Sequence, residues 1–158
     1  MKWTIRTVLL VSLLGLSACG GNAPPAPAAS AANTGEATET AGDVTIRASA
    51  LQTSTLDETV AKRYGIARDD KSVLLLVAVR KSDGADETSL PAKVTASAGG
   101  LSGGKQAIAM RELRTGDLLD YIGTVETSLP ETLRFEVTVV REGGATSNLK
   151  FNREFYPR

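Results

Sequence analysis

The sequence predicts a mainly β protein, an antiparallel sandwich of about seven strands with one short helix. Three observations lead to this fold class. Apolar and polar residues alternate with a period of two over several segments, turn-forming residues separate these segments, and no helical pattern recurs between them. Because parallel strands need long crossovers, usually helices, the lack of recurring helices favours antiparallel pairing.

Most of the expected strands show one apolar and one polar face, which is typical of strands at the surface of a sandwich. One segment is apolar throughout and is expected to be a central strand. In chain order, the expected strands are Val44–Ala50, the apolar Val73–Val79, Lys93–Ala98, Leu118–Val125, Leu133–Val139 and Leu149–Phe155. Turns between them are predicted at Ser82–Gly84, Thr115–Gly116 and Gly143–Gly144.

One helix is expected, roughly from Leu56 to Tyr64. The residues Thr55-Leu56-Asp57-Glu58 fit a capping box, in which the first residue is the N-cap. Gly65 and the apolar Ile66 behind it are typical of a helix C-terminus.

The segment Lys105–Arg114 suits two conformations. Ala107, Met110 and Leu113 have a helical spacing, whereas Ile108 and Met110 would lie on one face of a strand. Intrinsic propensity favours a helix, but the surrounding β pattern favours a strand. We therefore predict a strand here.

The segment Ser128–Thr132, followed by Phe135, resembles the corner between the fifth and sixth strands of fibronectin-type domains. The match is out of phase by one residue, and Phe135 stands in place of the tyrosine of that corner. This resemblance implies an immunoglobulin/fibronectin-like class of sandwich.

The N-terminus has the composition of an export signal. The basic residues Lys2 and Arg6 precede an apolar stretch, Thr7–Leu16. Its length of about ten residues is typical of a signal-peptide core. A bilayer core of roughly 30 Å needs about 20 apolar residues, so this stretch is too short to span it. Residues 1–18 are therefore expected to be a removable signal peptide.

Leu16-Ser17-Ala18-Cys19 resembles the lipobox of bacterial lipoproteins, and Cys19 is the single cysteine of the chain. The resemblance implies cleavage between Ala18 and Cys19 and acylation of Cys19, with fatty acids such as palmitate. Several acyl chains on one residue should anchor the protein stably to a membrane. The alternative is an ordinary secretory signal cleaved near Ala18, with Cys19 playing no part.

Residues 20–42 contain mainly Gly, Ala, Pro, Ser and Thr, a composition that cannot bury enough apolar surface to fold. We expect an acylated cysteine and a disordered tether over residues 19–42, and a single domain over residues 43–158. Loss of Lys2 and Arg6 with the signal leaves 16 Lys and Arg against 18 Asp and Glu. This near-neutral charge predicts no nucleic-acid partner.

The chain contains no histidine. Histidine is the most common general base and zinc ligand, so most hydrolase and metalloenzyme sites are excluded. Gly99–Lys105 fits the phosphate-loop pattern G-x-x-x-x-G-K, but Gln106 stands where that motif needs Ser or Thr. A glycine-rich connection between two strands is expected instead.

Ser102 and Lys105 also fit the S-x-x-K spacing, in which a lysine one helical turn away activates a serine nucleophile. Two glycines between them disfavour that turn. The acidic segment Asp83–Glu87 has oxygen ligands but not the spacing of a known calcium loop. No catalytic residue, cofactor or metal site is predicted, and strand carboxylates such as Glu126, Glu131 and Glu136 are expected at the surface.

Several short blocks in order resemble the bacterial domain-of-unknown-function family 4426. This resemblance implies a small protein exported to the periplasm of a Gram-negative bacterium, with no assigned activity and no catalytic residues to transfer. It also implies that the lipobox and long tether are additions, since relatives in this family have plain signal peptides. The blocks are Leu56–Ile66 with Arg68, Ser72–Leu75, Met110–Leu113 before Gly116-Asp117, Tyr121–Gly123, Glu131–Phe135 and Phe151–Tyr156.

These observations predict a non-catalytic, membrane-anchored envelope lipoprotein that binds or assembles an envelope protein partner through edge strands and loops. Gly20 follows Cys19 where an aspartate would favour the inner membrane, so the periplasmic face of the outer membrane is the expected location. One alternative is a small-ligand-binding domain that uses the sandwich interior or the Gly99–Gly104 loop. Another is a histidine-free hydrolase that uses Ser102 and Lys105.

Overall fold

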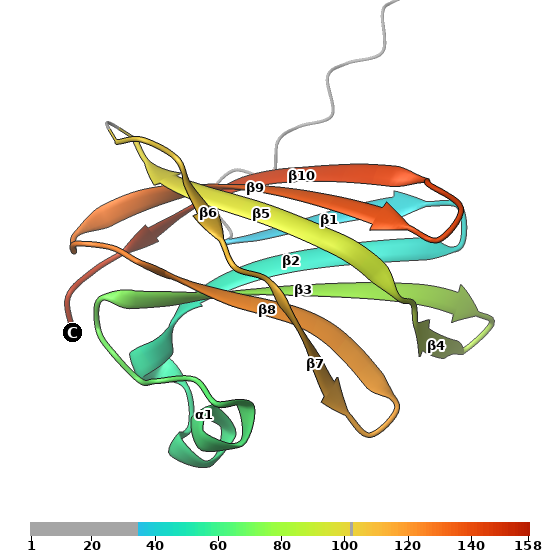
Figure 1. Cartoon of the computed structure of the whole chain (residues 1–158), viewed down its shortest axis with the longest axis horizontal. Coiled ribbons are helices and arrows are strands. Elements are labelled where there is room, and N and C mark those ends of the chain that lie inside the picture. Colours follow the sequence, from blue (N-terminus) through green and yellow to red (C-terminus); the bar gives the residue numbers. More distant parts are fainter. Residues whose placement is uncertain (1–34, 102) are drawn as a thin grey trace, which may run out of the picture.

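A computed structural model describes residues 35–101 and 103–158, which form two antiparallel sheets packed face to face (Figure 1). Sheet A has the order β1-β2-β3-β8-β7, with β4 paired to the end of β3, and sheet B has the order β10-β9-β5-β6. The strands are β1 (Glu36–Ala41), β2 (Val44–Gln52), β3 (Ser72–Asp83), β4 (Asp86–Ser89), β5 (Ala92–Gly100), β6 (Gln106–Ile108), β7 (Arg111–Thr115), β8 (Leu118–Glu126), β9 (Glu131–Arg141) and β10 (Thr146–Phe155). The mainly β sandwich that the sequence predicts is confirmed, with ten strands in the described residues where about seven were expected.

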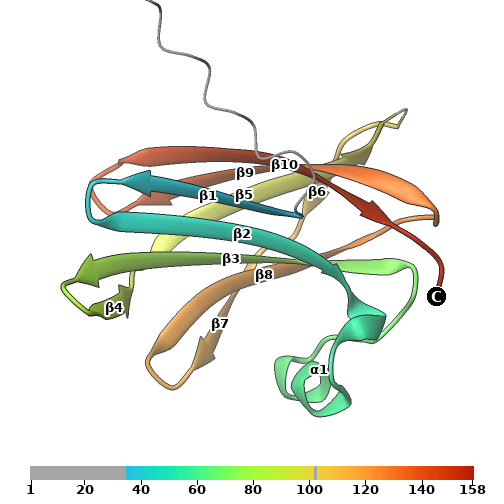
Figure 2. The ribbon, with the colours of Figure 1, turned by 180° about the vertical axis from the view of Figure 1, so that it is seen from behind.

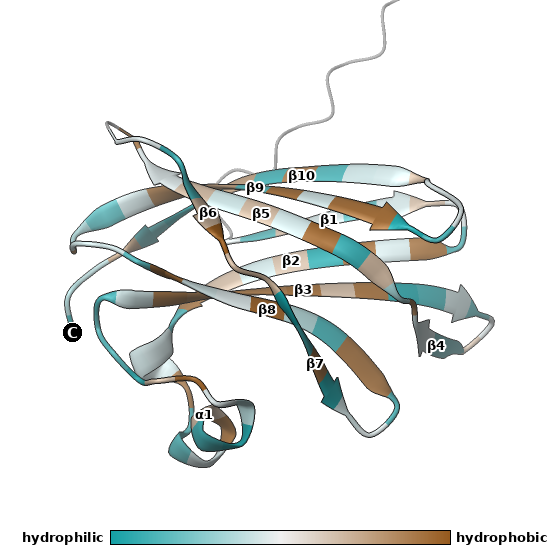
Figure 3. Cartoon of the chain, viewed as in Figure 1, coloured by the Kyte–Doolittle hydropathy of each residue, from teal (hydrophilic) through white to brown (hydrophobic). Residues whose placement is uncertain are grey.

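The core lies between the sheets and is built by the alternating residues that the sequence identifies. Val44, Ile46, Ala48 and Ala50 of β2 face Leu133, Phe135, Val137 and Val139 of β9, and all eight are buried. Phe135 also stacks on Phe151 of β10, with ring centroids 5.0 Å apart. Figure 3 shows the resulting alternation of hydrophobic and hydrophilic residues along the strands.

β1 lies within the segment that composition predicts to be a disordered tether, so that prediction is wrong for residues 36–41. The strand pairs with β2 through a two-residue turn and lies beside β10, which closes one side of the sandwich (Figure 2). Its inward Ala37 packs on the core, while its other residues are polar or small. Backbone hydrogen bonds hold such an edge strand, and these leave little trace in composition.

The segment 105–114 is a strand region, as predicted, but it is divided between the two sheets. β6 pairs with β5 in sheet B, and β7 pairs with β8 in sheet A. Between them, Ala109 and Met110 cross from one sheet to the other. Gly123 of β8 permits this crossing, because a Cβ there would lie 2.6 Å from Ile108 Cγ2 and 2.8 Å from the Ala109 carbonyl oxygen.

The predicted helix is α1 (Glu58–Tyr64), preceded by a 3-10 helix over Thr53–Thr55. Its N-cap is Asp57 and not Thr55, since the Asp57 carboxylate accepts hydrogen bonds from the Thr59 and Val60 amides. The predicted C-terminus is confirmed: Gly65 has φ 63°, and the Ile66 amide bonds to the Ala61 carbonyl at 2.9 Å. Among residues 35–101 and 103–158, α1 included, no helix is long and apolar enough to cross a membrane.

Candidate functional site

Several of the predictions made from the sequence fall on residues outside the described ones. They are the signal peptide over residues 1–18, the cleavage and lipidation site at Ala18 and Cys19, the sorting residue Gly20, and the candidate nucleophile Ser102.

Lys105, the predicted partner of Ser102, lies where β5 connects to β6. Its ammonium nitrogen is 2.7 Å from the Glu136 carboxylate of β9. The glycine-rich segment joins two antiparallel strands of sheet B, as expected, and is followed by a strand instead of the helix that a phosphate loop needs. Lys105 therefore forms a surface ion pair at the end of a hairpin.

The acidic segment forms the hairpin between β3 and β4, where Asp83 pairs with Asp86. Glu87 forms an ion pair of 3.1 Å with Arg47 of β2, and this hydrogen bond holds the pKa of Glu87 below its usual value. No group of three or more metal-ligating side chains (His, Cys, Asp or Glu) converges anywhere in the part of the chain that the structure describes. Glu126 is exposed, whereas Glu131 and Glu136 are half-buried in β9.

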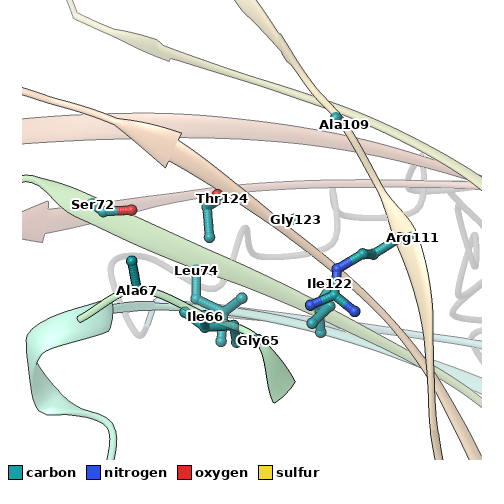
Figure 4. A pocket seen from close by; sticks show the side chains of 10 residues that line it. All are labelled: Gly65, Ile66, Ala67, Ser72, Leu74, Ala109, Arg111, Ile122, Gly123 and Thr124. Carbon is teal, nitrogen blue, oxygen red and sulfur yellow. The ribbon is translucent and has the colours of Figure 1, made fainter. Parts of the chain in front are cut away.

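A hollow of about 310 Å³ lies on the outer face of sheet A, between the segment that follows α1 and the start of β7 (Figure 4). We call it the crossover pocket, because the crossing from β6 to β7 forms one of its walls. Its lining residues come from four separate parts of the chain. They are Gly65, Ile66, Ala67, Ser72, Leu74, Ala109, Arg111, Ile122, Gly123 and Thr124.

The alternation of β3 and β8 produces the floor of this pocket. Leu75 of β3 and Tyr121 of β8 face the main core, so Leu74 and Ile122 face outward. There they form a second hydrophobic cluster with Ile66, and all three side chains are buried. The floor is therefore apolar although it lies on the outside of the sandwich.

The wall that follows α1 is fastened to the end of β2. The Thr53 hydroxyl, which is fully buried, donates to the Asp69 carbonyl at 3.0 Å and accepts from the Asp69 amide at 2.9 Å. Gln52 adds a hydrogen bond from its side-chain amide to the Asp70 carbonyl at 3.2 Å. These bonds join the two ends of the segment that contains α1. We call this segment, between Thr53 and Asp69, the α1 excursion.

Arg111, the first residue of β7, supplies the positive charge of the pocket. Its side chain extends over the outer face of sheet A, and Nη2 donates a hydrogen bond to the Tyr64 carbonyl at the end of α1. Within the described residues, no carboxylate forms an ion pair with Arg111. Ser72 and Thr124 lie across the pocket from Arg111 (Figure 4).

The strand that begins at Arg111 also has an unpaired edge. β7 pairs with β8 on one side, and no described strand pairs with it on the other. Leu119, opposite Arg114, directs its amide to Ser89 and its carbonyl to Arg80, on the far side of β8. In an antiparallel pair this leaves the backbone groups of Arg114 and Glu112 directed outward, where a further strand could pair.

None of the candidate catalytic, phosphate-binding or metal-binding motifs singled out from the sequence lies at this pocket, whereas four of the blocks that resemble family 4426 contribute residues to it. Two signals for it were nevertheless present in the sequence. An isolated glycine inside a strand pattern, here Gly123, often indicates close approach of another backbone segment. The Gly65-Ile66 pair predicts where the chain leaves α1, but not that it then packs on the outer face of a sheet.

Comparisons with known proteins find related folds among solved structures, and no curated protein matches. The crystal structure of a DUF4426 family protein from Pseudomonas aeruginosa PAO1 is 25% identical, with a TM-score of 0.65 over 78% of this chain and 97% of that chain. FetP of uropathogenic Escherichia coli strain F11, expressed in the periplasm, is 12% identical, with a TM-score of 0.55 over 77% of this chain and 94% of its own. A copper-bound FetP variant is 11% identical, with a TM-score of 0.55 over 78% and 92%.

The FetP structures share the fold with this chain at low identity. The first structure also shares sequence with it over the whole β domain. A family model, described as a domain of unknown function, matches residues 38–158, in agreement with the resemblance seen in the sequence. The chain therefore belongs to the DUF4426 family.

Proposed function

We propose that this chain is a lipid-anchored, non-catalytic binding protein of the bacterial envelope, and that its partner binds at the crossover pocket and along the edge of β7. The observation that carries the proposal is the position of Arg111. This residue lines the pocket and also begins the strand with the unpaired edge, so one partner can contact both features.

The location rests on the N-terminal sequence and on the relatives. The lipobox-like Leu16-Ser17-Ala18-Cys19 supports a lipid anchor, and Gly20 after Cys19 supports the periplasmic face of the outer membrane. The FetP neighbour, which shares the fold, was recombinantly expressed in the periplasm of E. coli, and the envelope location proposed here agrees with that compartment.

Binding without catalysis is supported by the chemistry of the described side chains. The chain has no histidine, and the ammonium of Lys105 is held by the Glu136 carboxylate. The nitrogen of this lysine is taken up by the ion pair with Glu136, so it is not placed to activate a nucleophile.

The copper of the FetP variant does not transfer to this chain. Copper in proteins is bound by imidazole and by the sulfur atoms of Cys and Met. The described residues contain no His or Cys, and Met110 is their one methionine. This donor set does not fit a copper site.

Photo-crosslinking in intact cells tests the proposed surface. A photoreactive amino acid would replace Ala67 at the pocket rim, Glu112 on β7, or, as a control, the exposed Lys93 on β5 of sheet B. We expect the same adduct from the first two positions and none from Lys93. Adducts from Lys93 alone, or from none of the three positions, would overturn the proposed surface.

A further inference from the structure

We propose that the crossover pocket is a carboxylate site, in which Arg111 binds the carboxylate of a ligand whose apolar part lies on Ile66, Leu74 and Ile122. This inference takes the location of binding from the proposed function and adds the chemistry of the ligand.

The charge of the pocket favours an anion. A guanidinium group has five N–H donors in a planar fork that matches both oxygens of a carboxylate. One of these donors, on Nη2, is used by the Tyr64 carbonyl, and the described residues offer Arg111 no carboxylate. The bond to Tyr64 also holds the side chain over the pocket, which reduces the entropy lost when a ligand binds.

The floor of the pocket has room for a small apolar group beside the carboxylate, on side chains that are themselves largely buried. Ile66, Leu74 and Ile122 form its base, while the small residues Ala67 and Ala109 leave room above them. The volume of about 310 Å³ lies at the lower end of the range for small-molecule sites. It suits a short aliphatic chain or one apolar amino-acid residue.

Two hydroxyl groups complete the pocket. Ser72 and Thr124 lie across from Arg111 (Figure 4), and neither side chain forms a hydrogen bond with another described residue. They can therefore bond to a polar group at the other end of a ligand. The site as a whole is suited to an amphipathic molecule with one negative end.

This carboxylate could belong to a small organic acid or to the C-terminal residue of a peptide. A peptide that pairs antiparallel to β7 runs from the Thr115 end toward Arg111, so its last residue arrives at the pocket. Its backbone would then pair with the outward groups of Glu112 and Arg114.

Four compounds distinguish these possibilities by NMR titration of the isotope-labelled full-length protein in lipid nanodiscs. They are hexanoate and its neutral analogue hexanamide, and acetyl-Ala-Ala-Leu as the free acid and as the C-terminal amide. For both pairs we expect the acid to bind at least tenfold more tightly and to shift the amides of Gly65, Gly123 and Thr124. Additional shifts at Glu112 and Arg114 with the tripeptide acid alone would identify a peptide C-terminus as the source.

Variants of the arginine test its role directly. We expect Arg111→Gln to weaken hexanoate binding at least tenfold and Arg111→Lys to weaken it less, while Arg134→Gln, at an exposed position on β9, leaves it unchanged. Because Arg111 also contacts α1, thermal unfolding of each variant is measured in parallel. Unchanged hexanoate affinity in Arg111→Gln would show that Arg111 has only a structural role.

The comparison of each acid with its neutral analogue needs no protein variant. It tests the carboxylate site separately from the proposed binding surface. Equal affinity of hexanoate and hexanamide, or shifts confined to another surface, would overturn the carboxylate site. Adducts from Ala67 and Glu112 in cells would in that case still support the proposed function.

Discussion

Arg80 of β3 is the charged side chain that lies buried among the described residues, and it links β3 to β8 in sheet A. Its guanidinium donates to the Leu119 carbonyl at 3.0 Å and forms an ion pair with Asp120, both on β8. Along β3, the pairing with β8 ends at Ala78 and the pairing with β4 begins at Arg80. The ion pair thus occupies a gap in the sheet that backbone pairing leaves.

Removal of the carboxylate should be costly at this position. We expect Asp120→Ala to lower the free energy of unfolding by about 3 kcal/mol, because breaking a buried pair leaves an uncompensated charge. Urea denaturation measures this change. The double variant Arg80→Met, Asp120→Leu should recover most of the loss, and an Asp120→Ala protein as stable as the wild type would contradict this role.

The ion pair between Lys105 and Glu136 makes a prediction about pH. The hydrogen bond from Lys105 lowers the pKa of Glu136 from its ordinary 4.5, and Lys150, 3.8 Å away, contributes less. The stabilising effect of this pair is therefore full above pH 4.5 and is lost as pH falls through the lowered pKa of the folded state.

We expect Lys105→Met to return the pKa of Glu136 toward 4.5 and so to remove the contribution of this carboxyl to the loss of stability in acid. A carbon-detected NMR titration of the Glu136 carboxyl measures the shift. The control Lys93→Met should leave that titration unchanged, and the same curve in both variants would show that Lys105 is not the cause.

At the scale of elements, the strands that form the core were the most predictable. In Val44–Ala50 and Leu133–Val139, apolar and polar residues alternate because one face of each strand is buried. This alternation can be recognised in the sequence. β1 and β4 lie at edges and are held by backbone hydrogen bonds, which no side-chain pattern records. The crossing at Ala109 and Met110 was not predicted, because neither residue is a Gly, Pro or Asn that would indicate a break in the strand.

The candidate pocket was less predictable than the fold. Its residues come from four parts of the chain that only the topology brings together, and most of them are small or apolar. Lys105 and Ser102 fitted a motif, yet Lys105 forms an ion pair far along the chain with Glu136. Spacing along the sequence carried no information about this partner, because the partner comes from another strand.

The excursion that contains α1 depends on Thr53. We expect Thr53→Val to destabilise the protein by about 1–3 kcal/mol, because the substitution removes the two hydrogen bonds that the buried Thr53 hydroxyl forms with the Asp69 backbone. Amide exchange at Ala61 and Ile66 should accelerate more than at Val137 in the sheet B core. Equal acceleration throughout would show that the Thr53 bonds do not hold this segment separately.

At the scale of the whole molecule, the donor set predicts how this chain differs from the FetP variant. Because the described residues lack His and Cys, we expect titration of Cu(II), or of Cu(I) under reducing conditions, to show no site tighter than about micromolar. Calorimetry of the full-length protein measures this. A tight one-to-one complex would contradict the conclusion that the FetP copper chemistry does not transfer.

The described chain begins at the same end of the sandwich as the pocket. The Gly35 carbonyl accepts a hydrogen bond from Ala50 near the end of β2, and Gln52 reaches the Tyr156 carbonyl near the C-terminus. The turns that join β1 to β2, β3 to β4 and β9 to β10 lie at the opposite end (Figure 1). Only residues 20–34 separate Cys19 from Gly35, so an anchor at Cys19 would keep this end within roughly 50 Å of the membrane.

The anchor itself is tested by Cys19→Ser. Each buried methylene of an acyl chain contributes about 0.8 kcal/mol, so an acylated Cys19 would hold the domain at the membrane without any other contact. We expect the wild type to incorporate an alkyne-labelled palmitate and to have a mass that begins at Cys19. The serine variant should incorporate none and should retain residues 1–18, because lipoprotein cleavage requires the acylated cysteine, while a control Ala23→Ser protein behaves as the wild type. A wild-type protein that is free of lipid and begins at another residue would instead indicate an ordinary secretory signal, and the pocket would then act in a protein free to diffuse.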